Sequence, residues 1–148
     1  MHIYIGSDHA GYNLKKEIKE YIDEKEGYEI TDLGSFSEES VDYPDIVREV
    51  TQKVLEYPDT FGIVICGTGQ GSCMTANKEK GIRAALCTNE YLAQKAREHN
   101  HANVLCMGER VTGAGVAKTI VDRFLETDID ESERHVRRVN KIERKQIK

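Results

Sequence analysis

Residues 61–66 form an unbroken apolar run, Phe-Gly-Ile-Val-Ile-Cys, and a glycine-rich segment at 67–71 follows it at once. A strand with one face in solvent alternates apolar and polar residues, whereas an apolar run without alternation is typical of a parallel strand covered on both faces. Covering both faces requires helices on both sides of the sheet. This run therefore favours an α/β domain with a parallel sheet.

The rest of the chain alternates between strand-like and helix-like segments, as such a sheet requires. The expected strands lie at 2–6, 28–33, 61–66, 82–87 and 104–107, and the expected helices at 11–25, from Pro44 onward, from about 72 to 77, and at 88–99, 112–125 and 134–148. We expect Thr88 to cap its helix. The helix at 112–125 should bury Val116, Ile120, Val121 and Phe124. Together these segments predict a Rossmann-like, doubly wound sheet of five parallel strands with a basic C-terminal helix.

Length and composition narrow the class of protein. The 148 residues fit one domain, 1–148, and 39% hydrophobic and 32% charged residues give a globular profile. No apolar run approaches the roughly 20 residues of a membrane span, so we expect no membrane partner. The N-terminal residues lack the features of a signal peptide, which predicts a cytoplasmic location.

Charge is divided unevenly along the chain. Residues 1–130 hold 14 Lys and Arg against 23 Asp and Glu, whereas residues 131–148 hold 7 against 3. The acidic body argues against nucleic-acid binding, and the basic tail lacks interleaved aromatic residues that could stack on bases. We expect 132–148 to be a helix that packs on a partner subunit, with Arg134, Arg138, Lys141 and Lys145 on one face. Arg134 and Arg138, one turn apart, could grip a phosphate.

The segment Cys66-Gly67-Thr68-Gly69-Gln70-Gly71-Ser72 carries the strongest chemical signal. Alternate glycines let backbone N–H groups converge on an anion, and the helix that follows adds its positive end. The spacing fits neither a dinucleotide-binding fingerprint nor a Walker A loop. At the head of this cradle the Cys66 thiol is a candidate base. The alternative is a plain turn behind a buried cysteine.

Two further segments hold candidate site residues. Asp8 and His9 follow the first strand, where they could bind sugar hydroxyls and phosphate, although Asp8 could equally cap the next helix. His99 and His101 end a helix, where the helix dipole favours a charged imidazole without any ligand. The sequence has no C-x-x-C pair, and the two histidines lack partner ligands, so we expect no metal site.

In this order along the chain, the motifs resemble the type B ribose-5-phosphate isomerase family, which includes the galactose-6-phosphate isomerase chains. The resemblance covers almost the entire length. Its landmarks are Gly6-Ser7-Asp8-His9-Ala10-Gly11, Val41-Asp42-Tyr43-Pro44-Asp45, Ile65-Cys66-Gly67-Thr68-Gly69-Gln70-Gly71, Ala76-Asn77-Lys78, Gly81-Ile82-Arg83-Ala84-Ala85, Glu98-His99-Asn100, Ala102-Asn103, Gly108-Glu109-Arg110-Val111, Glu133-Arg134-His135 and Arg138-Val139.

The resemblance implies that the chain interconverts ribose 5-phosphate and ribulose 5-phosphate through a cis-enediolate, without metal or cofactor, in the non-oxidative pentose phosphate pathway. It makes Cys66 the base that moves a proton between C2 and C1. It gives ring opening to His99, with His135 as the alternative. The other implied roles are the backbone of Gly67, Gly69, Gln70 and Gly71, assisted by Thr68, for the enediolate; Asp8, Tyr43 and Asn100 for the sugar; and His9, Arg110, Arg134 and Arg138 for the phosphate.

The family also implies a homodimer with sites between subunits, and a tetramer stays open. His99, Asn100 and Arg110 are then expected to serve the neighbour's Cys66. The chain departs from many relatives at Ser132-Glu133, where they carry two glycines, and Ser72 rules out the branch with a glutamate base there. Two other functions stay open: an isomerase of allose 6-phosphate or galactose 6-phosphate, and a phosphosugar-binding protein without catalysis.

Overall fold

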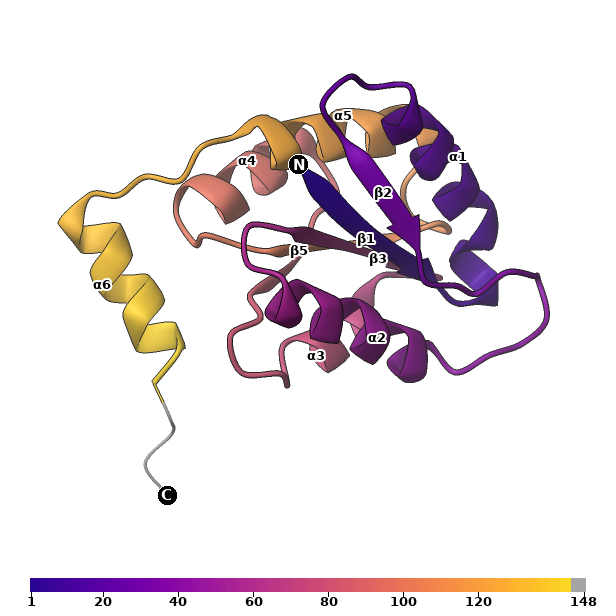
Figure 1. The fold of residues 1–148 in the computed structure, drawn as a ribbon, viewed down its shortest axis with the longest axis horizontal. Helices are drawn as coiled ribbons and strands as arrows, with labels where there is room; N and C mark the ends of the chain where they lie inside the picture. Colours follow the sequence, from indigo (N-terminus) through magenta and orange to yellow (C-terminus); the bar gives the residue numbers. More distant parts are fainter. Residues whose placement is uncertain (145–148) are drawn as a thin grey trace.

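The computed structural model describes residues 1–144, and its centre is one sheet of five parallel strands (Figure 1). The order across the sheet is β2-β1-β3-β5-β4, and every neighbouring pair is parallel. The predicted doubly wound parallel α/β fold is confirmed. The strands are β1 (His2–Ser7), β2 (Glu29–Asp32), β3 (Phe61–Cys66), β4 (Ala84–Leu86) and β5 (Val104–Gly108).

Helices cover both faces of the sheet, as the apolar run of β3 requires. Ile63 and Ile65 of β3 are buried against the first face, and Val64 is buried against the second. A short 3-10 turn, η1 (His9–Gly11), leads into the first helix, while α6 (Glu133–Ile142) stands apart from both layers (Figure 1). The first face holds α1 (Tyr12–Asp23), α4 (Glu90–Glu98) and α5 (Ala114–Glu126), and the second holds α2 (Tyr43–Glu56) and α3 (Gln70–Ala76).

Two predicted details were wrong, and a third is tested only in part. Asn89 rather than Thr88 caps α4, because the Asn89 side chain accepts the Leu92 N–H at 2.9 Å. Val116 is 49% exposed, since the buried stripe of α5 runs through Ala117 and leaves its neighbour about 100° away around the helix. The last helix ends at Ile142, and the predicted helical residues 145–148, Lys145 among them, lie outside the described residues.

The strand order determines where a ligand can enter. β2 lies on one side of β1 and β3 on the other, so the order in which strands are added across the sheet reverses at β1, and a crevice opens at the carboxyl ends of β1 and β3. The register pairs Ser7 with Ile65, and Cys66 with Gly108. The segments that follow β1, β3 and β5 therefore leave the sheet side by side.

A buried lysine holds the loop after β2 against the same edge. Lys15 of α1 is fully buried, and its ammonium donates to Asp32 Oδ1 at 2.8 Å and to the Ser35 carbonyl. Asp32 Oδ1 also accepts the Gly34 N–H at 2.9 Å. A buried ammonium is tolerated only when it is paired and hydrogen-bonded, so this contact fixes the loop that leads to α2.

Replacing Asp32 with the isosteric Asn removes the counter-charge and little else. We expect Asp32→Asn to lower the free energy of unfolding by about 3 kcal/mol, because the Lys15 ammonium is left buried and unpaired. The control is Asp23→Asn, which breaks an exposed pair with Lys19 at 3.7 Å and should cost less than about 1 kcal/mol. Urea unfolding followed by circular dichroism compares the two variants. Equal losses would contradict the assignment of Lys15 as the anchor.

Candidate active site

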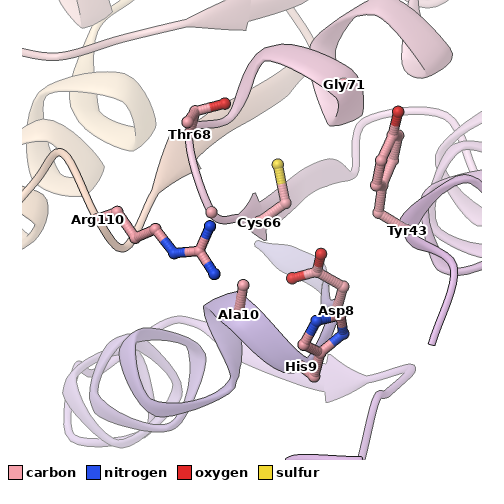
Figure 2. A pocket seen from close by; sticks show the side chains of 9 residues that line it. Asp8, His9, Ala10, Tyr43, Cys66, Thr68, Gly71 and Arg110 are labelled. Atoms are coloured by element: carbon pink, nitrogen blue, oxygen red, sulfur yellow. The ribbon is translucent and has the colours of Figure 1, made fainter. Parts of the chain in front are cut away.

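A pocket of about 320 Å³ opens at the carboxyl edge of the sheet (Figure 2). Segments from four parts of the chain meet there: η1, the start of α2, the loop after β3 and the loop after β5. In Figure 2 the Cys66 sulfur points into the space between Thr68 and Tyr43. The lining residues are Asp8, His9, Ala10, Tyr43, Cys66, Gly67, Thr68, Gly71 and Arg110.

The glycine loop curls around the thiol. The Gly69 N–H donates to Cys66 Sγ at 3.2 Å, and the Gln70 N–H donates to Thr68 Oγ1 at 3.3 Å. Gly69 has a φ of +83°, and a Cβ there would lie 2.5 Å from the Leu86 side chain, so the turn accepts glycine alone. The residues that line the pocket do not include Gly69 or Gln70, which act here through their backbone N–H groups, and their predicted contact with the substrate stays a prediction.

Asp8 caps η1 and also lines the pocket, so its predicted contact with the sugar stays a prediction. Its Oδ1 accepts the Gly11 N–H at 3.1 Å, which caps η1, and the residue also lines the pocket while only 6% exposed. His9 is oriented by the loop before α2, because the Val41 N–H donates to His9 Nδ1 at 3.2 Å. A ring nitrogen that accepts a hydrogen bond carries no proton, so Nε2 holds the proton and His9 offers the pocket a donor.

Tyr43 and Arg110 close the pocket from opposite sides. A Cβ on Gly71 would collide with the Tyr43 ring, so this glycine lets the aromatic ring lie against the loop. A Cβ on Gly67 would lie 3.2 Å from the Arg110 guanidinium, which places that cation beside the cradle of the same chain. Arg110 thus lies in the Cys66 pocket of its own chain, whereas the sequence predicted that it serves a neighbouring chain. Arg110 follows a strand, and loops that follow parallel strands share one edge.

A second group of predicted residues lies away from this pocket. His99 ends α4 and stacks on His135 of α6, with ring centroids 4.3 Å apart and planes within 9° of parallel. His135 is buried and its Nε2 lies 3.4 Å from Asp130 Oδ2. Burial is the main cause that lowers the pKa of His135, and the neighbouring His99 adds to it. Asn100, Arg134 and Arg138 are exposed around this pair.

The two groups occupy opposite edges of the sheet. In an α/β sheet each helix returns the chain from the carboxyl edge to the amino edge, so the end of α4 is far from the end of β3. The backbone carbonyl of Asn103, four residues past His99, accepts the Gly62 N–H at 3.0 Å near the start of β3. Cys66 lies four residues further on, about 13 Å along the strand. Figure 1 likewise shows α6 beyond the amino ends of the strands.

Cys73 of α3 is a second thiol whose environment favours its ionised form. Hydrogen bonding with the Cys106 thiol is the largest cause that lowers the pKa of Cys73 to about 7. Cys73 is partly exposed and does not line the active-site pocket. Thiol reagents would therefore label Cys73, and substitution is the cleaner test of Cys66.

Two features are absent from residues 1–144. No group of three or more His, Cys, Asp or Glu side chains in this range is placed to hold a metal ion. The same range contains no helix with the length and apolar character needed to cross a bilayer.

Comparison with known proteins identifies the family. A model of the family described as Ribose/Galactose Isomerase matches residues 3–142. Ribose-5-phosphate isomerase B of Escherichia coli is 44% identical, over 95% of this chain and 93% of that protein. A putative sugar phosphate isomerase of Bacillus subtilis is 45% identical, over 96% and 95%. The structure of ribose-5-phosphate isomerase B from Clostridium thermocellum superposes with a TM-score of 0.91 at 52% identity, over 97% and 95%. The chain therefore belongs to the ribose/galactose isomerase family.

Proposed function

We propose that this chain interconverts ribose 5-phosphate and ribulose 5-phosphate, with Cys66 as the base. One observation carries the proposal: the Cys66 sulfur accepts the Gly69 N–H inside a pocket that also presents the Asp8 carboxylate and the Arg110 guanidinium. The names of the relatives from Escherichia coli and Clostridium thermocellum support the choice of substrate. The family model, whose description also names galactose, supports the reaction class.

The proposed reaction moves one proton between neighbouring carbons. The Cys66 thiolate takes the proton from C2 of the open-chain aldose, which leaves a cis-enediolate, and the same sulfur returns a proton to C1. The proton of the O2 hydroxyl passes to O1, so that C2 becomes the ketone and the former aldehyde oxygen becomes a hydroxyl. A backbone N–H beside the sulfur suits this cycle, because a thiolate accepts hydrogen bonds and donates none. The sulfur thus alternates between base and acid.

The negative charge that develops on the enediolate oxygens must be stabilised by hydrogen-bond donors. The first N–H groups of a helix have no acceptor within the helix, so those of Gly71 and Ser72 at the start of α3 are available to the developing oxyanion. One preorganised donor of this kind is worth about 3 kcal/mol in a transition state. Thr68 is held beside the cradle by the Gln70 N–H and can assist at the same oxygens.

The pocket of one chain is chemically incomplete for a sugar phosphate. Arg110 is the one Lys or Arg among its lining residues, and no ring-opening acid accompanies His9 there. The missing groups, His99, Asn100, Arg134 and Arg138, stand on the opposite edge of the sheet. We infer a homodimer in which one subunit lends these residues to the other's Cys66. The cytoplasmic location stays an expectation from the N-terminal sequence.

Two other functions make different predictions. An isomerase of allose 6-phosphate or galactose 6-phosphate would use the same proton transfer on a longer sugar, and a phosphosugar-binding protein would hold the ligand without turnover. Turnover of the three sugar phosphates, measured side by side, decides among them. Inactivity on ribose 5-phosphate with turnover of a hexose phosphate would overturn the substrate, and inactivity on all three would overturn the enzyme.

Replacing the base should abolish turnover while the ligand still binds. We expect Cys66→Ser to lower kcat roughly 10³-fold, the scale of a lost proton-transfer group, with KM within about threefold of wild type. Cys73→Ser is the matched control, since it makes the same change on α3 outside the pocket. A coupled assay for the ketose measures both variants. Equal kcat values for Cys66→Ser and wild type would remove Cys66 from the mechanism.

Shared sites should allow two inactive variants to complement each other. Mixed dimers of Cys66→Ala and His99→Ala subunits contain one site with both wild-type residues, so we expect up to about half of wild-type activity in each such dimer. Subunit exchange is checked with two affinity tags on the two variants. Confirmed mixed dimers without activity would show that each site is built within one chain.

The titration of His135 should depend on the imidazole stacked against it. The fold lowers the pKa of His135, so the unfolded chain binds a proton at this residue before the folded chain does, as pH falls through about 6.5. His135 therefore lowers the free energy of unfolding below that pH. We expect NMR titration to place the His135 midpoint below the ordinary value. His99→Gln should raise the midpoint without restoring it fully, since burial is the larger cause. An unchanged midpoint in His99→Gln would contradict the coupling.

A further inference from the structure

Helix α6 has little to hold it in place by packing. It spans ten residues, and His135 and Val139 are its only buried ones. A helix of this length is marginal in water without tertiary support. Its position must therefore depend on specific polar contacts at its ends.

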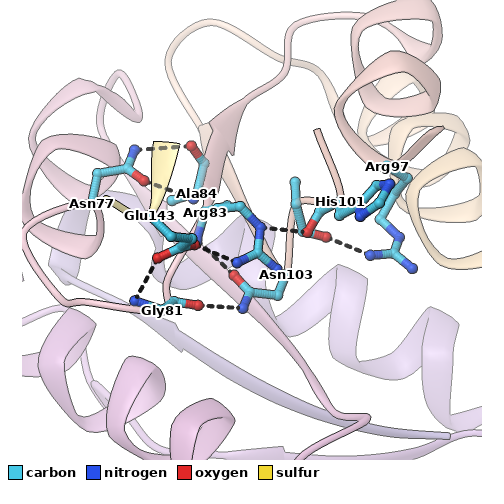
Figure 3. A network of polar contacts seen from close by, with 9 residues as sticks. Asn77, Gly81, Arg83, Ala84, Arg97, His101, Asn103 and Glu143 are labelled. Carbon is cyan, nitrogen blue, oxygen red and sulfur yellow. Dashed lines mark hydrogen bonds and ion pairs between the residues drawn. The ribbon is translucent and has the colours of Figure 1, made fainter. Parts of the chain in front are cut away.

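The C-terminal end of α6 is clamped by both oxygens of one carboxylate (Figure 3). Glu143 Oε1 accepts from the Arg83 guanidinium, and Glu143 Oε2 accepts the Gly81 N–H at 3.2 Å. The Arg83 and Glu143 side chains are 22% and 28% exposed, so water screens the pair only in part. We name these three residues the α6 clamp.

The two clamp residues that precede β4, Arg83 and Gly81, are held in place by further hydrogen bonds. Arg83 Nε donates to the His101 carbonyl at 3.0 Å, and the Arg83 N–H donates to Asn103 Oδ1 at 2.8 Å. Asn103 Nδ2 in turn donates to the Gly81 carbonyl at 2.9 Å. Figure 3 shows this network joining the turn before β4 to the turn before β5. The clamp thus ties α6 to the segment 98–103.

The N-terminal end of α6 reaches the same segment through Asp130. The Asp130 N–H donates to the Glu98 carbonyl at 2.8 Å, and its own carbonyl pairs with His101 Nε2 at 3.0 Å. Its carboxylate accepts the Ser132 N–H at 2.8 Å. Both ends of α6 are therefore tied to residues 98–103, which include His99 and Asn100.

We propose that Glu143 is a positioning residue, which fixes α6 at its second end so that Arg134 and Arg138 stand in register with His99. Without it, α6 would keep only the Asp130 contacts and the His99–His135 stack near its first turn, and the part of α6 that carries Arg138 would move relative to His99. Arg138 lies five residues from Glu143, about 7.5 Å along the axis, so it is the more sensitive of the two. This inference rests on the proposed function, in which these arginines hold the phosphate for a neighbouring Cys66.

The test is Glu143→Gln in the full chain, assayed with ribose 5-phosphate. We expect KM to rise roughly tenfold, the scale of a lost charge-assisted contact, with kcat within about threefold of wild type, because the base and cradle are untouched. Hydrogen exchange of 133–142 should become faster while that of β3 stays as it is. The matched control is Glu56→Gln, which breaks an exposed pair with Lys53 on α2 and should change neither.

A double variant separates a clamp from two unrelated effects. Arg83→Gln with Glu143→Gln should raise KM no more than the larger single change, because both remove the same pair. A rise in KM in the double variant equal to the product of the two single rises would overturn the clamp. An unchanged KM in Glu143→Gln, or a fall in melting temperature and kcat without a KM effect, would overturn the positioning role. Inactive wild type on every sugar phosphate would instead overturn the proposed function.

Discussion

All five strands point the same way, and this shared direction decides where each functional group can act. Whatever follows a strand lies at the carboxyl edge, and whatever follows a helix lies at the amino edge. Asp8, Cys66 and Arg110 follow strands and share one pocket, while His99 follows a helix and does not. The division of the predicted site into two groups is thus a property of the topology rather than of any single contact.

This division gives the two edges different tasks. The carboxyl edge holds the proposed base in a glycine cradle, where the Gly69 N–H meets the sulfur and where any larger residue would strike Leu86. The amino edge holds a stacked imidazole pair and a helix tied down at both ends, with exposed arginines between. Each edge has what the other lacks, and in a symmetric dimer one contact of this kind would occur twice.

The sequence predicted the local structure correctly where the residues that form it are neighbours in the chain. The apolar run of β3 and the loop that follows could be placed correctly because strand, turn and helix start are adjacent in the chain. Arg110 was expected to serve a neighbouring chain, although the direction of β5 alone favours the pocket of its own chain, where it lies. Contacts between distant residues could not be foreseen: Lys15 occurs in a polar stretch yet is fully buried, and Arg83 meets Glu143 across 60 residues. Such pairs leave no periodic pattern, since each depends on how two loops pack in space.

The proposed mechanism requires Cys66 to move a proton between two carbons of the sugar. Proton NMR of ribose 5-phosphate with the protein in D₂O tests it directly, because a proton held on a thiol exchanges with solvent before it returns to carbon. Wild-type protein should place deuterium at the exchanging carbon of the products, and Cys66→Ser should place none there over the same time. Deuterium incorporation at an equal rate by Cys66→Ser, or turnover by wild type without any incorporation, would contradict this mechanism.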